Sequence, residues 1–214
     1  MKPLGILGGT FDPIHYGHLR PAQEVLLALD LAEVRIIPAA NPPHRRPPLA
    51  TVAQRLRMAE LAVAEFPGLR VDDREIKRGG PSYTVLTLES LREEFGTRPL
   101  CLLLGLDAFG GLETWHQWQR LPELAHMVVM TRPGWSLPAA DVLPSWTRGR
   151  LAHAAGDLAR TSAGKIHFQT VTPQDISATR IREAIARNEP VDGLLPPAVL
   201  DYLRANRIYL NREN

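Results

Sequence analysis

The chain has 214 residues, of which 44% are hydrophobic and 22% are charged, and its formal net charge is +2. These values are those of an ordinary globular protein with room for one good-sized core, and they exclude a disordered chain and a chain coated with basic charge for nucleic acid. A single cysteine, Cys101, excludes an intrachain disulfide framework, and the chain shows neither a signal-peptide core nor an apolar run as long as a membrane span, so we expect a cytoplasmic protein.

The first motif follows a short apolar run, residues 4–7, that predicts a buried strand. Its sequence is Gly8-Gly9-Thr10-Phe11-Asp12-Pro13-Ile14-His15-Tyr16-Gly17-His18. A helical pattern continues from it to about residue 29. Adjacent glycines let a ligand approach the backbone, and a helix start offers unpaired N–H groups and the positive end of the helix dipole, so this turn favours a phosphate. His15 and His18 are three residues apart and can reach one anion from the same side of the helix.

Each part of this motif also has a plainer explanation. A histidine pair at this spacing fits two surface residues, and a Gly-Gly pair after a strand fits an ordinary tight turn. A zinc site would need a third ligand, and the chain has neither a His-Glu-x-x-His motif nor paired cysteines. We therefore predict no metal held by protein side chains.

Residues 34–38 predict a second buried strand, which gives a β-α-β start of the doubly wound kind. A proline-rich loop follows at residues 41–48, and its prolines prevent a helix, so that His44, Arg45 and Arg46 are held outward. A solvated basic loop would explain these side chains. Their position at the carboxyl end of a strand, beside the Gly-Gly turn, favours contacts with a triphosphate.

The middle of the chain alternates helical and extended patterns. Residues 51–66 predict a capped helix, residues 69–71 a third strand and residues 74–80 a loop. Ser82 is expected to cap a helix over residues 83–95. The first-turn N–H groups of that helix fit either an ordinary cap or a bound carboxylate.

A fourth strand is predicted at residues 100–104 and is followed by Gly105 and Asp107. Ligands collect at the carboxyl ends of parallel strands near a switch point, so Asp107 fits a ribose hydroxyl as well as a helix cap. Trp115 and Trp118 stand three residues apart, a spacing typical of a core pair. Their polar surroundings leave a stacking role open for one of them.

A fifth strand is predicted at residues 127–131 and the last strand at residues 166–171. Between them, residues 132–164 are rich in Pro, Ala, Gly and Ser, which fits a mobile flap with a modest helical stretch at 150–158.

A second anion site is predicted where the next helix starts, after residue 175. Ser177 is expected to cap this helix, and Thr179 and Arg182 fall together on its first turn. Hydroxyl groups, free amides and an arginine at one helix start suit an anion. A final helix is predicted at residues 198–206.

The first motif resembles the signature of the nucleotidyltransferase superfamily with the His-x-Gly-His motif, whose members transfer a nucleoside monophosphate from a nucleoside triphosphate. This resemblance implies an α/β fold with a single Rossmann-like, doubly wound parallel sheet. The chain has neither a Walker lysine loop nor a kinase-type glycine loop, so adenylyl transfer is favoured over γ-phosphoryl transfer. An acceptor that is a phosphate monoester is already largely ionised at neutral pH, so we expect direct in-line attack without a general base or a covalent intermediate.

Within the superfamily, the length and internal motifs are most similar to the bacterial nicotinate-nucleotide adenylyltransferases, over residues 8 to about 182. That family joins ATP and nicotinate mononucleotide into deamido-NAD and pyrophosphate, a step of NAD biosynthesis. The catalytic residues that the resemblance implies are His15 and His18. The ATP-binding residues that it implies are Gly8, Gly9, Thr10, Phe11, His18, Gly105, Asp107, Ser177, Thr179 and Arg182. The substrate-binding residues that it implies are Thr84, Trp115, His116, His44, Arg45 and Arg132.

In that family the tryptophan stacks on the pyridine ring, and backbone amides at the positions of Thr84 and His116 hold the nicotinate carboxylate. Two positions depart from the family pattern, because His116 stands where an aromatic residue such as tyrosine is common and Ala178 replaces a common serine. The expected partners are ATP, accompanied by Mg²⁺, and nicotinate mononucleotide, without nucleic acid or membrane. A homo-oligomer is left open.

We expect residues 1–214 to form a single nucleotidyltransferase domain, with a C-terminal helical part from about residue 175 that carries the Ser-x-Thr-x-Ile-Arg motif. Three alternatives remain at this point. A pantetheine-phosphate adenylyltransferase shares the chemistry in a shorter chain, and a nicotinamide-mononucleotide enzyme would differ in its lack of preference for the acid. A nucleotide sensor on the same scaffold would bind without catalysis.

Overall fold

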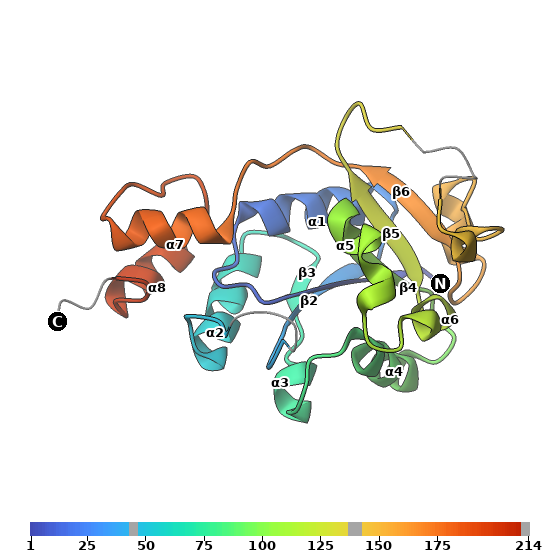
Figure 1. Ribbon diagram of the computed structural model, residues 1–214, viewed down its shortest axis with the longest axis horizontal. Helices are drawn as coiled ribbons and strands as arrows, with labels where there is room; N and C mark the ends of the chain where they lie inside the picture. Colours follow the sequence, from blue (N-terminus) through green and yellow to red (C-terminus); the bar gives the residue numbers. More distant parts are fainter. Residues whose placement is uncertain (43–46, 137–142, 211–214) are drawn as a thin grey trace.

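The computed structural model describes residues 1–42, 47–136 and 143–210 of the chain. At its centre lies one parallel sheet of six strands in the order β3-β2-β1-β4-β5-β6 (Figure 1). The strands are β1 (Leu4–Gly9), β2 (Glu33–Pro38), β3 (Leu69–Val71), β4 (Leu100–Gly105), β5 (His126–Thr131) and β6 (Ile166–Thr170). The strand order reverses between β1 and β4, which is the switch point of a doubly wound sheet. The predicted α/β fold is therefore confirmed.

The helices follow the strands in sequence and cover both faces of the sheet (Figure 1). The α-helices are α1 (Tyr16–Ala28), α2 (Val52–Val63), α3 (Arg74–Arg78), α4 (Thr84–Phe95), α5 (Leu106–Gly110), α6 (Leu121–Leu124), α7 (Ala178–Ala186) and α8 (Pro197–Ala205). Short 3-10 turns are η1 (Leu112–Thr114), η2 (Trp118–Arg120), η3 (Ser145–Thr147) and η4 (Ala155–Ala159). None of the helices in the described part of the chain is long and apolar enough to span a membrane.

The core is divided by the sheet into two buried clusters. On β1, Leu4 and Ile6 face a cluster shared with α4, α5 and α6, whereas Leu7 faces the cluster built by α1, α2, α7 and α8. On β4, Cys101 and Leu103 likewise face the α1 side. This alternation is the period of two expected of a strand buried on both faces, and it explains why the strands are continuous apolar runs in the sequence.

The C-terminal helices α7 and α8 lie beyond one end of the sheet, and a long segment from β6 runs beside α1 to reach them (Figure 1). The backbone N–H of Thr172 in that segment donates to the Glu24 carboxylate of α1 at 2.7 Å. Ile181 of α7 and Val199 of α8 are fully buried in the same cluster as α1 and α2. The C-terminal part is thus packed on the core that supports the first motif.

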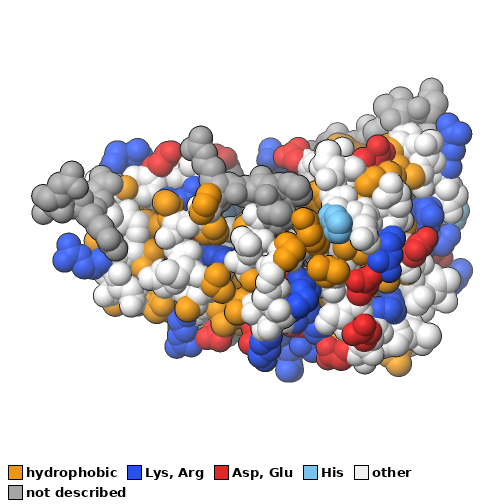
Figure 2. Space-filling view, turned by 60° about the horizontal axis from the view of Figure 1, so that its bottom comes forward, with side chains coloured by type: hydrophobic (Ala, Val, Ile, Leu, Met, Phe, Trp, Pro, Cys, Tyr) orange, Lys and Arg blue, Asp and Glu red, His pale blue; other side chains and the backbone are white. Residues whose placement is uncertain are grey.

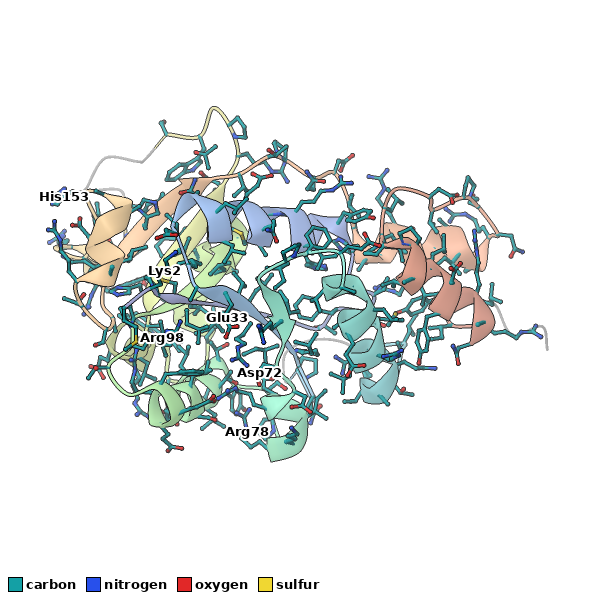
Figure 3. The ribbon with its side chains drawn as sticks, turned by 180° about the vertical axis from the view of Figure 1, so that it is seen from behind. Lys2, Glu33, Asp72, Arg78, Arg98 and His153 are labelled. Carbon is teal, nitrogen blue, oxygen red and sulfur yellow. The ribbon has the colours of Figure 1, made fainter. Side chains whose placement is uncertain are left out.

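Two local predictions are wrong, in each case where a carboxylate binds nearby backbone N–H groups. Residues 74–80 were expected as a loop, but α3 begins at Arg74, whose backbone N–H and side chain both donate to the Asp72 carboxylate. Asp72 forms an ion pair with Arg35, which also pairs with Glu33. Figure 3 labels Glu33 and Asp72 near strands β2 and β3. The modest helix expected at 150–158 is only the 3-10 turn η4, which the Asp157 carboxylate holds through two backbone N–H groups.

Candidate active site

A cavity of about 730 Å³ opens at the carboxyl ends of β1 and β4, at the switch point of the sheet. Predicted site residues from four separate stretches of sequence form its walls. They are Gly8, Gly9, Thr10, Phe11, His18, Thr84, Trp115, His116, Thr179 and Arg182. In the space-filling view, hydrophobic side chains gather in the middle of the face and charged side chains lie mainly along its edges (Figure 2).

The two histidines of the first motif stack on each other, with ring centroids 3.8 Å apart. His18 lines the cavity, and His15 lies behind it with 5% of its surface exposed. Burial lowers the pKa of His15 from its ordinary value of 6.5 to about 4, so its ring is neutral at physiological pH. Gly17 is required between them, because a Cβ there would approach the His15 ring to 2.9 Å.

The tautomer of His18 follows from a backbone contact. The N–H of His15 donates to Nδ1 of His18 at 3.3 Å, so Nδ1 of a neutral His18 is unprotonated. The ring proton then sits on Nε2, which makes His18 a hydrogen-bond donor. The helix start of α1 therefore fixes both the position and the proton of the ring.

The turn before the histidines is shaped by its glycines and by Phe11. A Cβ on Gly8 would meet no atom within 4 Å, so this residue leaves open space at the cavity. A Cβ on Gly9 would come within 2.7 Å of the Phe11 ring. Phe11 itself adopts a left-handed backbone with φ of 51° and packs edge-on against His18, at 5.1 Å between centroids. A left-handed backbone is unfavourable for a non-glycine residue and persists only where the surrounding packing holds it.

The second predicted anion site meets the first through Arg182. Its guanidinium donates to the backbone carbonyl of Asp12 at 2.7 Å and to the Thr179 hydroxyl at 3.2 Å. Ser177 occupies the N-cap position of α7 as predicted, but its side chain makes no capping hydrogen bond and does not line the cavity. The first turn of α7 therefore faces the cavity through its other residues.

The segment expected to hold the acceptor forms the opposite wall. Thr84 is the first residue of α4, and the rings of Tyr83 and His116 stack at 4.2 Å beside Trp115. Within the described residues, the backbone N–H groups of Thr84 and His116 have no hydrogen-bond partner. Two free donors at one wall suit an anionic group.

Ser82 is not the cap of α4, which corrects the prediction. Tyr83 takes the N-cap position, and the Ser82 hydroxyl instead accepts from the backbone N–H of Asn41 at 3.0 Å. The Ser82 N–H also donates to the Asn41 carbonyl at 2.9 Å. Ser82 therefore ties the acceptor wall to the end of β2.

Three predicted residues lie at the carboxyl ends of strands but outside the cavity walls. Gly105 is the exposed last residue of β4, Asp107 is exposed in the first turn of α5, and Arg132 is exposed directly after β5. His44 and Arg45 lie outside the described residues. The cavity as it stands thus unites the first motif, the helix starts and the Trp115 segment.

Sequence reasoning missed two buried charged groups at the cavity. Arg55 of α2 is 1% exposed and donates to the carbonyls of Thr10 at 2.7 Å and Ala39 at 2.6 Å, which joins the first turn to the end of β2. Glu75 of α3 lines the cavity and accepts from the Thr87 hydroxyl at 2.5 Å. Neither residue belongs to a motif, and only the fold brings them to the site.

In residues 1–42, 47–136 and 143–210, no group of three or more His, Cys, Asp or Glu side chains could hold a metal ion. The Asp12 carboxylate at the cavity already accepts two backbone N–H groups and a tyrosine hydroxyl. A divalent ion at this site would need ligands from a bound molecule.

Comparison with known proteins identifies relatives that match this chain over most of its length. The family model described as cytidylyltransferase-like matches residues 6–184. A protein of Aeromonas hydrophila named probable nicotinate-nucleotide adenylyltransferase is 47% identical over 97% of each chain, and one of Halorhodospira halophila with the same name is 51% identical over 93% of this chain and 91% of its own.

Solved structures share the fold at low sequence identity. A nicotinic acid mononucleotide adenylyltransferase of Plasmodium falciparum complexed with NaAD has a TM-score of 0.72 at 14% identity, and its complex with APC has a TM-score of 0.69 at 15% identity. Both cover 98% of this chain and 98% of their own. The chain therefore belongs to the cytidylyltransferase-like family, among the nicotinate-nucleotide adenylyltransferases.

Proposed function

We propose that this chain transfers the adenylyl group of ATP to nicotinate mononucleotide, giving deamido-NAD and pyrophosphate by direct in-line attack. The observation that carries the proposal is the union, in one cavity, of the His-x-Gly-His turn, the start of α7 and the Trp115 wall. The first two suit the triphosphate and the third suits the acceptor. We also infer that residues 1–214 act as one domain, because α7 and α8 share the core of α1 and α2.

His18 is the residue that we place at the α-phosphate. Its Nε2–H donates to the oxygen on which negative charge grows as the new bond forms. His15 stays neutral behind it and holds the ring through the stacked contact. Because the acceptor phosphate is already ionised, the protein supplies alignment and charge stabilisation rather than a base.

Arg182, Thr179 and the first turn of α7 are placed to hold the β- and γ-phosphates. Arg182 donates to the Asp12 carbonyl in the structure, and a bound triphosphate would offer it a second acceptor close by. Mg²⁺ would enter with ATP, held by the phosphate oxygens, and when bound it would neutralise phosphate charge. Ser177, Gly105 and Asp107 remain proposed contacts for the nucleotide.

The acceptor carboxylate fits the free N–H groups of Thr84 and His116, and its pyridine ring fits the face of Trp115. The two donors favour the nicotinate anion over the neutral nicotinamide, since the amide nitrogen would bring N–H groups toward N–H groups. The His116 side chain, in place of a common tyrosine, keeps the aromatic stack on Tyr83. Arg132, and His44 with Arg45, remain proposed phosphate contacts of the acceptor.

The test is an assay of pyrophosphate and dinucleotide with ATP, Mg²⁺ and either nicotinate mononucleotide or phosphopantetheine, run on the wild type and on His18→Asn. We expect equal amounts of pyrophosphate and deamido-NAD with the first acceptor, and a large loss in the variant. Turnover of phosphopantetheine in place of nicotinate mononucleotide would be consistent with adenylyl transfer but would contradict the proposed acceptor. ATP binding without product from either acceptor would favour the sensor.

A further inference from the structure

The side chain of Asp12 in the first motif is a buried junction, with 7% of the residue exposed. Its carboxylate accepts from the backbone N–H groups of Leu49 at 2.8 Å and Ala50 at 3.0 Å, just before α2. It also accepts from the hydroxyl of Tyr209 at 2.6 Å. Asp12 and Tyr209 are 197 positions apart, so the C-terminal segment closes back onto the phosphate turn.

The backbone around Tyr209 contains two residues with positive φ angles. Arg207 and Tyr209 are both left-handed, with φ of 51° and 66°. Left-handed conformations are unfavourable for such side chains, and two of them within three positions persist only where the surrounding contacts hold them. Burial, together with the hydrogen bond to and charge of Asp12, raises the pKa of Tyr209, so its hydroxyl stays protonated and remains the donor. Tyr209 lies outside residues 6–184, the part that the family model matches.

Asp12 connects Tyr209 to the residues that we propose bind the triphosphate, namely the first turn and Arg182. Its backbone carbonyl accepts from Arg182, and the carbonyl of Thr10, two residues earlier, accepts from Arg55. A shift of Asp12 would therefore move both the turn that faces the α-phosphate and the arginine that faces the other phosphates. Among the described residues, no hydrogen bond joins the Trp115 wall directly to Asp12, Tyr209 or Arg182, and its link to the first turn runs only indirectly through Ser82, the end of β2 and Arg55. We therefore expect the acceptor side to move less than the nucleotide side.

We propose that Tyr209 is a positioning residue for adenylyl transfer, which holds Asp12 so that the first turn and Arg182 are set for ATP. This inference rests on the proposed function. It predicts an effect on one substrate only, because Tyr209 acts through the nucleotide side of the cavity. A residue that merely stabilised the fold would change the amount of folded enzyme and leave both KM values unchanged.

The experiment is steady-state kinetics on Tyr209→Phe, which removes one hydroxyl and keeps the ring. We expect KM for ATP to rise about tenfold, the effect of losing one hydrogen bond to a charged group, and KM for nicotinate mononucleotide to stay within about twofold. Tyr202→Phe is the matched control, because it removes a hydroxyl from α8 that has no hydrogen bond among the described residues. It should leave both KM values unchanged. Circular dichroism establishes that both variants are folded at the assay temperature.

A double-mutant cycle with Asp12→Asn gives a second, independent result. In that background the acceptor for Tyr209 is already weakened, so we expect Tyr209→Phe to raise KM for ATP by no more than about twofold further. The inference is overturned by a Tyr209→Phe enzyme with an unchanged KM for ATP, by a parallel rise of both KM values, or by full additivity in the cycle. A wild type without adenylyl transfer would instead refute the proposed function.

Discussion

Because His15 is buried in its neutral form, the free energy of unfolding should depend on pH, and His15→Asn should remove this part of the dependence. The pKa of His15 is about 4 in the folded chain, against an ordinary value of 6.5. Well above pH 6.5 the ring is neutral in both states and its contribution is fully present. As pH falls from 6.5 toward 4, the unfolded chain takes up a proton that the folded chain refuses, so the free energy of unfolding decreases.

The size of this effect follows from the two pKa values. Between pH 7.5 and pH 4.5 the wild type should lose about 2.5 kcal/mol through His15. His15→Asn has no such proton to bind, while the other buried histidine, His126, is common to both proteins and cancels in the comparison. The assay is urea unfolding of both proteins at four pH values across this range. Parallel curves for the two proteins would refute the reasoning, because they would show that His15 titrates alike in both states.

Three further substitutions test the geometry around the cavity. His18→Asn should lower kcat by a factor of hundreds, about 3 kcal/mol of lost transition-state stabilisation, with a melting temperature close to that of the wild type; a comparable turnover would remove His18 from the chemistry. Gly17→Ala should lower kcat at least about tenfold, because its Cβ would lie 2.9 Å from the His15 ring, even though alanine is the better helix former. Gly156→Ala is the control: its Cβ would meet no atom within 4 Å, so kcat should not change. Arg55→Met should lower the free energy of unfolding by about 2 kcal/mol, because it leaves the partly buried carbonyls of Thr10 and Ala39 unpaired. Equal denaturation midpoints would contradict that role.

The fold could be predicted from the sequence because local and global signals agree in the strands. The central strands β1, β4 and β5 are largely apolar runs that are buried on both faces, so the pattern alone locates them. The first and last motifs were also predictable, because a glycine turn or a hydroxyl-rich helix start offers hydrogen-bond donors to an anion in any fold. Cap residues were less predictable. Ser82 suits an N-cap by residue type, yet its hydroxyl binds Asn41, a partner 41 positions away.

The supporting network of the site could not be predicted from any local pattern. Arg55 contacts the first turn across 45 positions, and Tyr209 contacts it across 197. An arginine in an amphipathic helix and a tyrosine near the C-terminus resemble ordinary surface residues until the chain is folded. Such residues set the position of the motif, and they are visible only through the hydrogen bonds that they make.

The ratio of kcat/KM for nicotinate mononucleotide to that for nicotinamide mononucleotide, measured by pyrophosphate release with ATP and Mg²⁺, tests the account most directly. The free N–H groups of Thr84 and His116 predict a ratio of at least about one hundred in favour of the acid, the value of roughly two hydrogen bonds to a charged group. A ratio near one, or one in favour of the amide, would contradict the assignment of this wall to the nicotinate carboxylate.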